Sequence, residues 1–203
     1  MRSSLSVLAA AATTLLVGCE TMPGQSASTT ATAAAPALPS GYTCCNLHYE
    51  NDWISDANWS SMPMIPAGAS IKVLDYGRYR IMTEIDGRKM RLGLDYGRQQ
   101  PLEEWAGKIV VSEDPRRKIA AWPAPVRDAV RAGKVAIGMS REQVIVAIGY
   151  PPMHQTPSLD SPRWKYWHTG FGSYLVLWDG AGRVKDVIAD PQTRFGVLHE
   201  PGR

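Results

Sequence analysis

The sequence predicts an α+β fold in which a small all-β module precedes a module of two helices and three antiparallel strands. Three observations support this prediction. Residues 70–94 alternate apolar and polar side chains around an Asp-Gly pair, a pattern typical of a β-hairpin. Residues 140–149 carry the start and stop signals of a short helix. Three aromatic- and valine-rich runs between turn residues then indicate strands within residues 164–188.

The N-terminus has the pattern of a targeting segment. The apolar stretch from Leu5 to Val17 is too short to span a bilayer as a helix. Its end, Leu16-Val17-Gly18-Cys19, resembles the lipobox of a bacterial lipoprotein. The resemblance implies a signal peptide over residues 1–18 and lipidation of Cys19; an ordinary secretory signal is the alternative. Acyl chains on Cys19 would anchor the protein to a membrane without spanning it.

Residues 19–40 consist mostly of Thr, Ser, Ala, Pro and Gly, and we interpret them as a disordered tether. In lipoproteins of this class, an Asp after the lipidated Cys retains the protein in the inner membrane. Glu20 stands at that position here, so the resemblance implies an outer-membrane location facing the periplasm. No later segment approaches 18 apolar residues, and we therefore predict no transmembrane helix.

The composition points to protein partners. The net charge is +3 with acidic and basic residues interspersed, which leaves no nucleic-acid footprint. Seven Trp and eight Tyr against two Phe form an unusual aromatic set. Such amphipathic aromatics favour interfaces and envelope surfaces, but they also fill small β cores, and a core role is the default interpretation for most of them. Partners in the cell envelope and no nucleic acid are therefore expected.

Cys44 and Cys45 are adjacent in the sequence. The periplasm is oxidising, so free thiols are exceptional there and the pair is a candidate disulfide. A strained vicinal bond, two intermolecular bridges, or one buried and one exposed thiol are open alternatives. The four histidines show no metal-ligand spacing with these cysteines, so the sequence predicts neither a metal site nor a cofactor.

Residues 41–118 are predicted to form the β module. Strands are expected over 70–74, 80–85 and 89–94, with Asp86-Gly87 as the hairpin turn. These short strands resemble an SH3-like barrel, with a plain meander as the alternative. A weak helix over 101–108, a last strand over 109–111 and a charged turn over 113–117 complete the module.

An internal repeat lies within the β module. Leu74-Asp75-Tyr76-Gly77-Arg78 recurs as Leu94-Asp95-Tyr96-Gly97-Arg98. The repeat predicts two equivalent strand ends, each turned by a glycine, which can adopt a positive φ. A chance match within a plain meander, and an acidic-aromatic ligand lip at both strand ends, are the alternatives.

Residues 119–203 are predicted to form the α+β module. A first helix is expected over 123–132, with Pro near its start and Gly after its end. Ser140 and Gln143 form a capping box for a second helix, which ends at Gly149. Three antiparallel strands then follow, separated by glycine-containing turns. Their predicted ranges are 164–167, 174–178 and 183–188.

Four segments of this module resemble the BamE (SmpA/OmlA) family of outer-membrane lipoproteins. They are Gly138–Val144, Ala147–Pro151, Trp164–Tyr166 and Asp179–Val184. The resemblance implies two helices packed on a three-stranded sheet, and an accessory role in the β-barrel assembly machinery. The typical member lacks residues 41–112, and its contact segment before the first helix has no clear match in Lys118–Pro123.

No catalytic site is predicted. The sequence lacks a Gly-x-Ser-x-Gly elbow, a His-Glu-x-x-His motif and a glycine-rich phosphate loop. Trp122, Trp164 and Tyr166 are the candidate partner-binding residues, because Trp and Tyr anchor interfaces well. Trp122 precedes the first helix, where the family makes contacts, and a core position is its alternative.

Three functional interpretations follow from these observations. The leading one is a non-enzymatic outer-membrane lipoprotein that acts as a BamE-like scaffold or assembly factor in β-barrel insertion or envelope integrity. The second is a peptidoglycan- or peptide-binding module that uses Trp53, Trp59 and Tyr76 of the SH3-like half. The third is a thiol-dependent enzyme in which Cys44 or Cys45 acts with His48.

Overall fold

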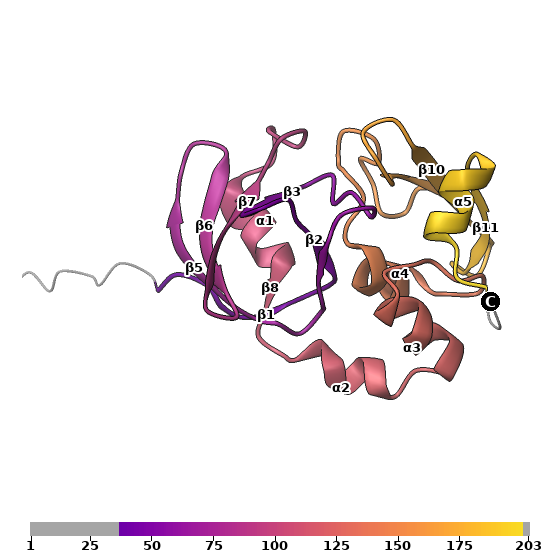
Figure 1. Ribbon diagram of the computed structural model, residues 1–203, viewed down its shortest axis with the longest axis horizontal. Helices are drawn as coiled ribbons and strands as arrows, with labels where there is room; N and C mark the ends of the chain where they lie inside the picture. The colour runs from indigo at the N-terminus through magenta and orange to yellow at the C-terminus, as the bar shows by residue number, and fades with distance from the viewer. Residues whose placement is uncertain (1–36, 201–203) are drawn as a thin grey trace, which may run out of the picture. The chain divides into compact units, whose positions relative to one another are not determined.

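Eleven strands and five helices form between residues 37 and 200, the part of the chain that the computed structural model describes (Figure 1). The strands are β1 (Ser40–Thr43), β2 (Leu47–His48), β3 (Trp53–Ser55), β4 (Met64–Ile65), β5 (Ser70–Tyr76), β6 (Arg80–Ile85), β7 (Arg88–Gly93), β8 (Val110–Val111), β9 (Arg163–Trp167), β10 (Ser173–Trp178) and β11 (Val184–Ile188). The helices are α1 (Leu102–Ile109), α2 (Pro115–Ala120), α3 (Ala124–Arg131), α4 (Arg141–Ile148) and α5 (Pro191–Val197). The predicted α+β class is confirmed.

The predicted signal peptide, the lipidation site Cys19 and nearly all of the predicted tether lie outside the described residues. β1 begins at Ser40, the last residue of the predicted tether, and Val73 N donates to Pro39 O at 2.8 Å. The ordered backbone pairing therefore starts slightly earlier than predicted. None of the helices within residues 37–200 is long and apolar enough to cross a membrane.

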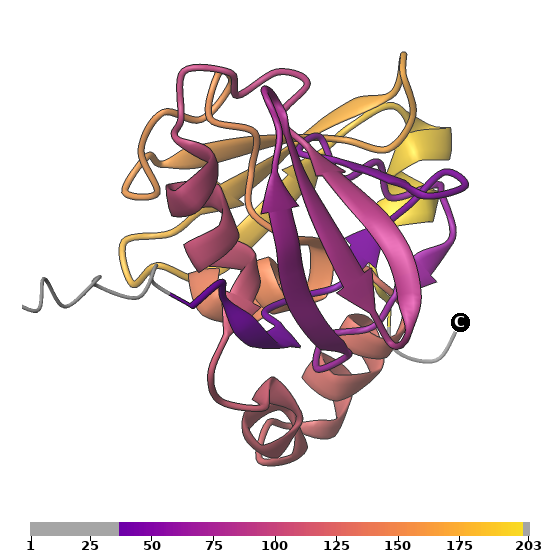
Figure 2. The same ribbon diagram turned by 90° about the vertical axis from the view of Figure 1, so that its left-hand side faces the viewer.

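The larger sheet belongs to the β half of the described chain (residues 40–111) and curls around its own hydrophobic cluster. Its strand order is β3-β7-β6-β5-β1-β8, and every neighbouring pair is antiparallel except β3 and β7. Figure 2 shows the twist of β5, β6 and β7. Every second residue of β6 is buried: Ile81, Thr83 and Ile85. The hydrophobic cluster also contains Trp105 and Ile109 of α1.

Asp86 and Gly87 connect β6 to β7. Their φ angles are 46° and 77°, and positive values at both positions are what a two-residue type I′ turn requires. Ile85 then pairs with Arg88 across the hairpin. The predicted hairpin is confirmed.

The prediction for the pentapeptide repeat is wrong. Neither Gly77 nor Gly97 has a positive φ, so neither is a left-handed turn residue. The first copy continues β5 as far as Tyr76, whereas the second lies beyond the end of β7 at Gly93. The two copies therefore occupy different structural positions.

The C-terminal half (residues 115–198) has its own hydrophobic cluster. Residues of α3 and α4 and of the antiparallel sheet β11-β10-β9 contribute to it. Ser140 Oγ accepts from Gln143 N at 3.3 Å, and Gln143 Oε1 accepts from Ser140 N at 2.8 Å. Gly149 then ends α4 with a φ of 82°. The predicted capping box and glycine stop are confirmed.

Two helices of this half are absent from the sequence-based prediction. The segment interpreted as a charged turn begins α2, where Asp114 accepts from Arg116 N at 3.0 Å and Pro115 is the first helical residue. Asp190 caps α5 in the same way, followed by Pro191. An Asp-Pro pair supplies both an N-cap oxygen and a residue preset for the first turn, which is the signal that was missed.

Two buried asparagines of the β half join it to the helices of the C-terminal half. Asn46 Nδ2 donates to Val130 O of α3 at 2.7 Å and to Ala147 O of α4 at 2.8 Å. Asn58 Nδ2 donates to Ile148 O at 2.9 Å. These carbonyls lie in the last turns of their helices, where intrahelical donors run out. The asparagines therefore cap both helices across the junction.

Candidate functional site

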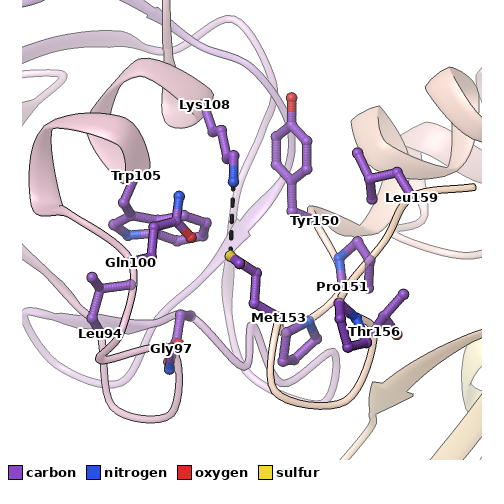
Figure 3. Close-up of a pocket in the computed structure, with 13 residues that line it drawn as sticks. Leu94, Gly97, Gln100, Trp105, Lys108, Tyr150, Pro151, Met153, Thr156 and Leu159 are labelled. Carbon is purple, nitrogen blue, oxygen red and sulfur yellow. Dashed lines mark hydrogen bonds between the residues drawn. The ribbon is translucent and has the colours of Figure 1, made fainter.

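A small cavity lies where the loop after α4 covers one end of the β half (Figure 3). Its volume is about 80 Å³. The β half contributes Asp56, Leu94, Gly97, Gln100, Trp105 and Lys108, and the loop contributes Tyr150, Pro151, Pro152, Met153, Thr156, Pro157 and Leu159. Sites for drug-sized ligands usually enclose about 300–1,000 Å³. The cavity therefore suits a single side chain or a small group.

Asp56 lines this cavity and binds the neighbouring backbone. Its carboxylate is buried and accepts hydrogen bonds from the backbone N–H groups of Asp95 at 3.0 Å, Tyr96 at 3.2 Å and Gly97 at 2.6 Å. Burial raises the pKa of Asp56, and the hydrogen bonds from Gly97 and Tyr96 oppose that change. Asp56 thus holds the second copy of the repeat in place across 41 positions of sequence.

Trp105 and Lys108 of α1 add further polar groups to the lining, beside Asp56, Gln100 and Thr156. Trp105 Nε1 is buried and has no hydrogen-bond partner within residues 37–200. Lys108 Nζ lies 2.9 Å from Glu104 Oε1 and 3.9 Å from Met153 Sδ. Leucines, prolines and Met153 supply the apolar part of the lining, so the cavity combines apolar walls with a few polar side chains.

Two of the three candidate partner-binding residues are core residues, which corrects the prediction. Trp164 is 0% exposed and Tyr166 is 2% exposed. Tyr166 Oη donates to Gly149 O at 3.1 Å, so even its polar end is used inside the fold. Trp122 is half-buried and packs against the C-terminal cluster. A partner on the surface cannot reach the first two side chains.

Cys44 and Cys45 are joined to each other by a disulfide and are buried in the cluster of the β half. Of the pairings left open by the sequence, the structure contains the vicinal one. His48 Nδ1 lies 2.8 Å from Met62 O, and burial lowers the pKa of its imidazole. The thiol interpretation needs a thiolate, which a paired cysteine does not supply.

The three residues of the peptide-binding interpretation do not share one cavity. Trp53 Nε1 donates to Asp95 Oδ2 at 2.9 Å, and the guanidinium groups of Arg80 and Arg91 lie over its ring. Tyr76 lines a separate depression, which neither Trp53 nor Trp59 lines. Stacking of a ligand on Trp53 would first have to displace the arginines.

The chain's two phenylalanines are both exposed, and sequence analysis missed them. Phe171 is fully exposed between Gly170 and Gly172, and Phe195 of α5 is 73% exposed. Their segments approach each other where a Cβ on Gly172 would lie 2.9 Å from Thr193 Oγ1; Thr193 is buried, and Phe195, two positions further along α5, lies on a different side of that helix. We call Phe171 and Phe195 the phenylalanine pair. The available signal was a large apolar residue flanked by glycines in a predicted turn.

Within residues 37–200, no group of three or more His, Cys, Asp or Glu side chains is placed to hold a metal ion. A scan against protein-family models, a search of curated proteins and a search of solved structures each found no match to this chain.

Proposed function

We propose that the protein is a non-enzymatic outer-membrane lipoprotein that faces the periplasm and acts as a BamE-like scaffold or assembly subunit in β-barrel insertion. The lipobox pattern ending at Cys19 supports the anchor. The packing of α3 and α4 with β9, β10 and β11 in one cluster is the arrangement that the family resemblance implies. We also propose that the curled sheet of the β half is an SH3-like module.

The observation that carries the proposal is the exposed phenylalanine pair. Large aromatic side chains are usually buried, and exposed ones often mark an interaction surface. Lys134 Nζ lies 5.5 Å from the centre of the Phe195 ring, so a cation borders the apolar group. An aromatic anchor with a charged rim is typical of a protein–protein contact. Phe171 and Phe195 replace Trp164 and Tyr166 as the partner-binding residues.

Crosslinking of intact envelopes followed by affinity capture tests this proposal. The double variant Phe171→Ser/Phe195→Ser should lose most of the captured β-barrel assembly subunits, because two anchors of about 2 kcal/mol each correspond to a large loss of affinity. Leu74→Ser is the matched control, since Leu74 is 39% exposed on the other half. Equal capture by the double variant would contradict the proposal.

Two further measurements extend the test. Cys19→Ser should abolish acyl labelling and release the protein from membranes. Loss of the native gene should sensitise the outer membrane to large antibiotics, and the Phe171→Ser/Phe195→Ser variant should fail to restore resistance. Sedimentation of the protein with purified peptidoglycan, without any permeability change, would favour the wall-binding alternative instead.

A further inference from the structure

We propose that the β half carries a binding site for a phosphate monoester, formed by Arg78, Arg98 and Tyr79. The site is independent of the phenylalanine pair. The two guanidinium carbons each lie 5.1 Å from the centre of the same Tyr79 ring. All three residues line an open depression of about 420 Å³. The structure thus brings two exposed cations to one aromatic side chain.

The internal repeat accounts for this convergence. Arg78 and Arg98 are the last residues of its two copies. Tyr79 directly follows the first copy, and Leu94 N at the start of the second copy donates to Tyr79 O at 3.0 Å, so backbone pairing places both copies beside Tyr79. Turn geometry does not explain the repeat, since neither of its glycines has a positive φ. Placement of two arginines on Tyr79 is what the copies have in common.

The acidic residues of the repeat do not neutralise these arginines. Asp75 Oδ1 accepts from Tyr76 N at 2.8 Å, and Asp95 Oδ2 accepts from Trp53 Nε1 at 2.9 Å. Among residues 37–200, no carboxylate lies within ion-pair distance of Arg78 or Arg98. Glu103 is the one acidic residue that lines the depression. The depression therefore keeps a positive excess.

The charge and shape of the pair favour phosphate over carboxylate. A phosphate monoester carries a charge of about −1.5 to −2 at neutral pH, which matches two guanidinium groups. Each guanidinium offers a planar fork of N–H donors that fits phosphate oxygens bidentately. Tyr79 limits the conformations of both long side chains by stacking, which lowers the entropy lost on binding. Glu103 offsets one positive charge of the depression, so the preference for phosphate rests on its three acceptor oxygens, which can serve both guanidinium forks, whereas a carboxylate has only two oxygens.

The ligand could be soluble or part of a lipid, and two probes separate these sources. Full-length protein in dodecyl maltoside micelles is titrated with glycerol 3-phosphate by calorimetry. Flotation then measures binding to phosphatidylcholine vesicles with and without phosphatidic acid. Binding of both probes indicates that a soluble ester suffices; binding of phosphatidic acid vesicles alone indicates a lipid-borne ligand. Either result supports the site, and binding of neither probe overturns it.

Variants distinguish a built site from general electrostatic attraction. Arg78→Gln/Arg98→Gln should bind about tenfold more weakly, and Arg163→Gln/Lys185→Gln, which removes two exposed charges from the C-terminal half, should bind like the wild type. Tyr79→Ala keeps every charge and should still weaken binding several-fold. Arg78→Lys/Arg98→Lys should also bind less well, because it loses the bidentate fork. Wild-type affinity in the Gln pair, or an equal loss in the control pair, would refute the proposal.

Discussion

The sheet of the C-terminal half and the connections of the β half place their Trp and Tyr residues in opposite ways. The C-terminal half buries four of them, with exposures of 7% or less: Trp164, Tyr166, Tyr174 and Trp178. In the β half, Tyr79 and Tyr96 are 40% and 48% exposed. Guanidinium groups lie over Tyr79, and the ring of His154 stacks on Tyr96. Aromatic content by itself therefore does not locate a binding surface.

Strand periodicity explains the difference. Trp164 and Tyr166 are two residues apart in β9, and Tyr174 and Trp178 are four apart in β10, so each pair lies on one face of its strand. The ring centres of Trp164 and Trp178 are 4.6 Å apart across the sheet. Tyr79 lies in the connection between β5 and β6, where no such alternation buries it. Aromatic residues that recur at every second position of a strand indicate a core. A single aromatic residue next to an arginine in the connection between two strands indicates a surface.

The halves also differ in what fixes their backbone. Residues within three or four positions of one another define the start of α4, whereas its last turn, before Gly149, also accepts hydrogen bonds from Asn46 and Asn58. The β half depends on side chains that reach distant backbone, such as Asn46 and Asp56. Loss of a distant contact should therefore cost more stability than loss of a local cap.

Asn46→Ala should have the largest effect. It would leave the buried Ala67 N without its acceptor at 2.9 Å and Ala147 O without its donor at 2.8 Å, whereas Val130 O still accepts from Gly133 N at 3.1 Å. We expect the free energy of unfolding to fall by about 4 kcal/mol, because unsatisfied buried polar groups cost about 1–3 kcal/mol each. Urea denaturation measures this change. Gln192→Ala, an exposed control on α5, should change it by less than about 0.5 kcal/mol. A loss below ~1 kcal/mol for Asn46→Ala would show that the junction does not depend on this residue.

Asp56→Asn should cost about 2 kcal/mol, because its amide nitrogen replaces one of the two carboxylate oxygens and cannot accept from the N–H groups that this oxygen now satisfies. The effect should also depend on pH. Burial raises the pKa of Asp56 in the folded state, so the proton stabilises the folded form. That stabilisation is complete below the unfolded pKa of about 3.9 and is lost as the pH rises through the raised value.

The difference in unfolding free energy between wild type and Asp56→Asn should therefore decrease as the pH rises above about 4 and then become constant. Urea denaturation of both proteins across this range provides the measurement. Taking the difference cancels the contribution of Asp52, Asp114 and Asp190, whose lowered pKa values act in the opposite direction. A difference that increases with pH would mean that the pKa of Asp56 is lowered instead.

The two repeat glycines should respond differently to the same substitution. A Cβ on Gly97 would lie 2.9 Å from Asp56 Oδ2, so Gly97→Ala should destabilise the fold by about 1–2 kcal/mol. A Cβ on Gly77 would lie 3.2 Å from Arg80 Cγ, part of a flexible side chain. Gly77→Ala should therefore stay within about 0.5 kcal/mol of the wild type. Thermal melting of both variants checks this; equal losses would restore the view that the two copies are equivalent.

Local signals made parts of both halves predictable. The Ser140 capping box, the Gly149 stop and the Asp86-Gly87 turn are each encoded within a few residues. The parallel pairing of β3 with β7 and the reach of Asn46 to α3 and α4 connect distant positions, and no local pattern contains them. The convergence of Arg78 and Arg98 depends on both the sequence and the fold. The repeat is visible in the sequence, but only the fold shows that its copies meet at Tyr79.

Among the four substitutions expected to destabilise the fold, Ser140→Ala should have the smallest effect, because it removes a local cap. Loss of the hydroxyl leaves Gln143 N without its acceptor, although Gln143 Oε1 still accepts from Ser140 N. An N-cap hydroxyl contributes about 1 kcal/mol, which corresponds to roughly 2–4 °C in the melting temperature of a domain of this size. Ser112→Ala, at an exposed serine outside any helix, is the matched control and should melt like the wild type. If Ser140→Ala costs as much as Asn46→Ala, the C-terminal half depends on its local caps as strongly as on the distant contacts, and the proposed difference between the halves does not hold.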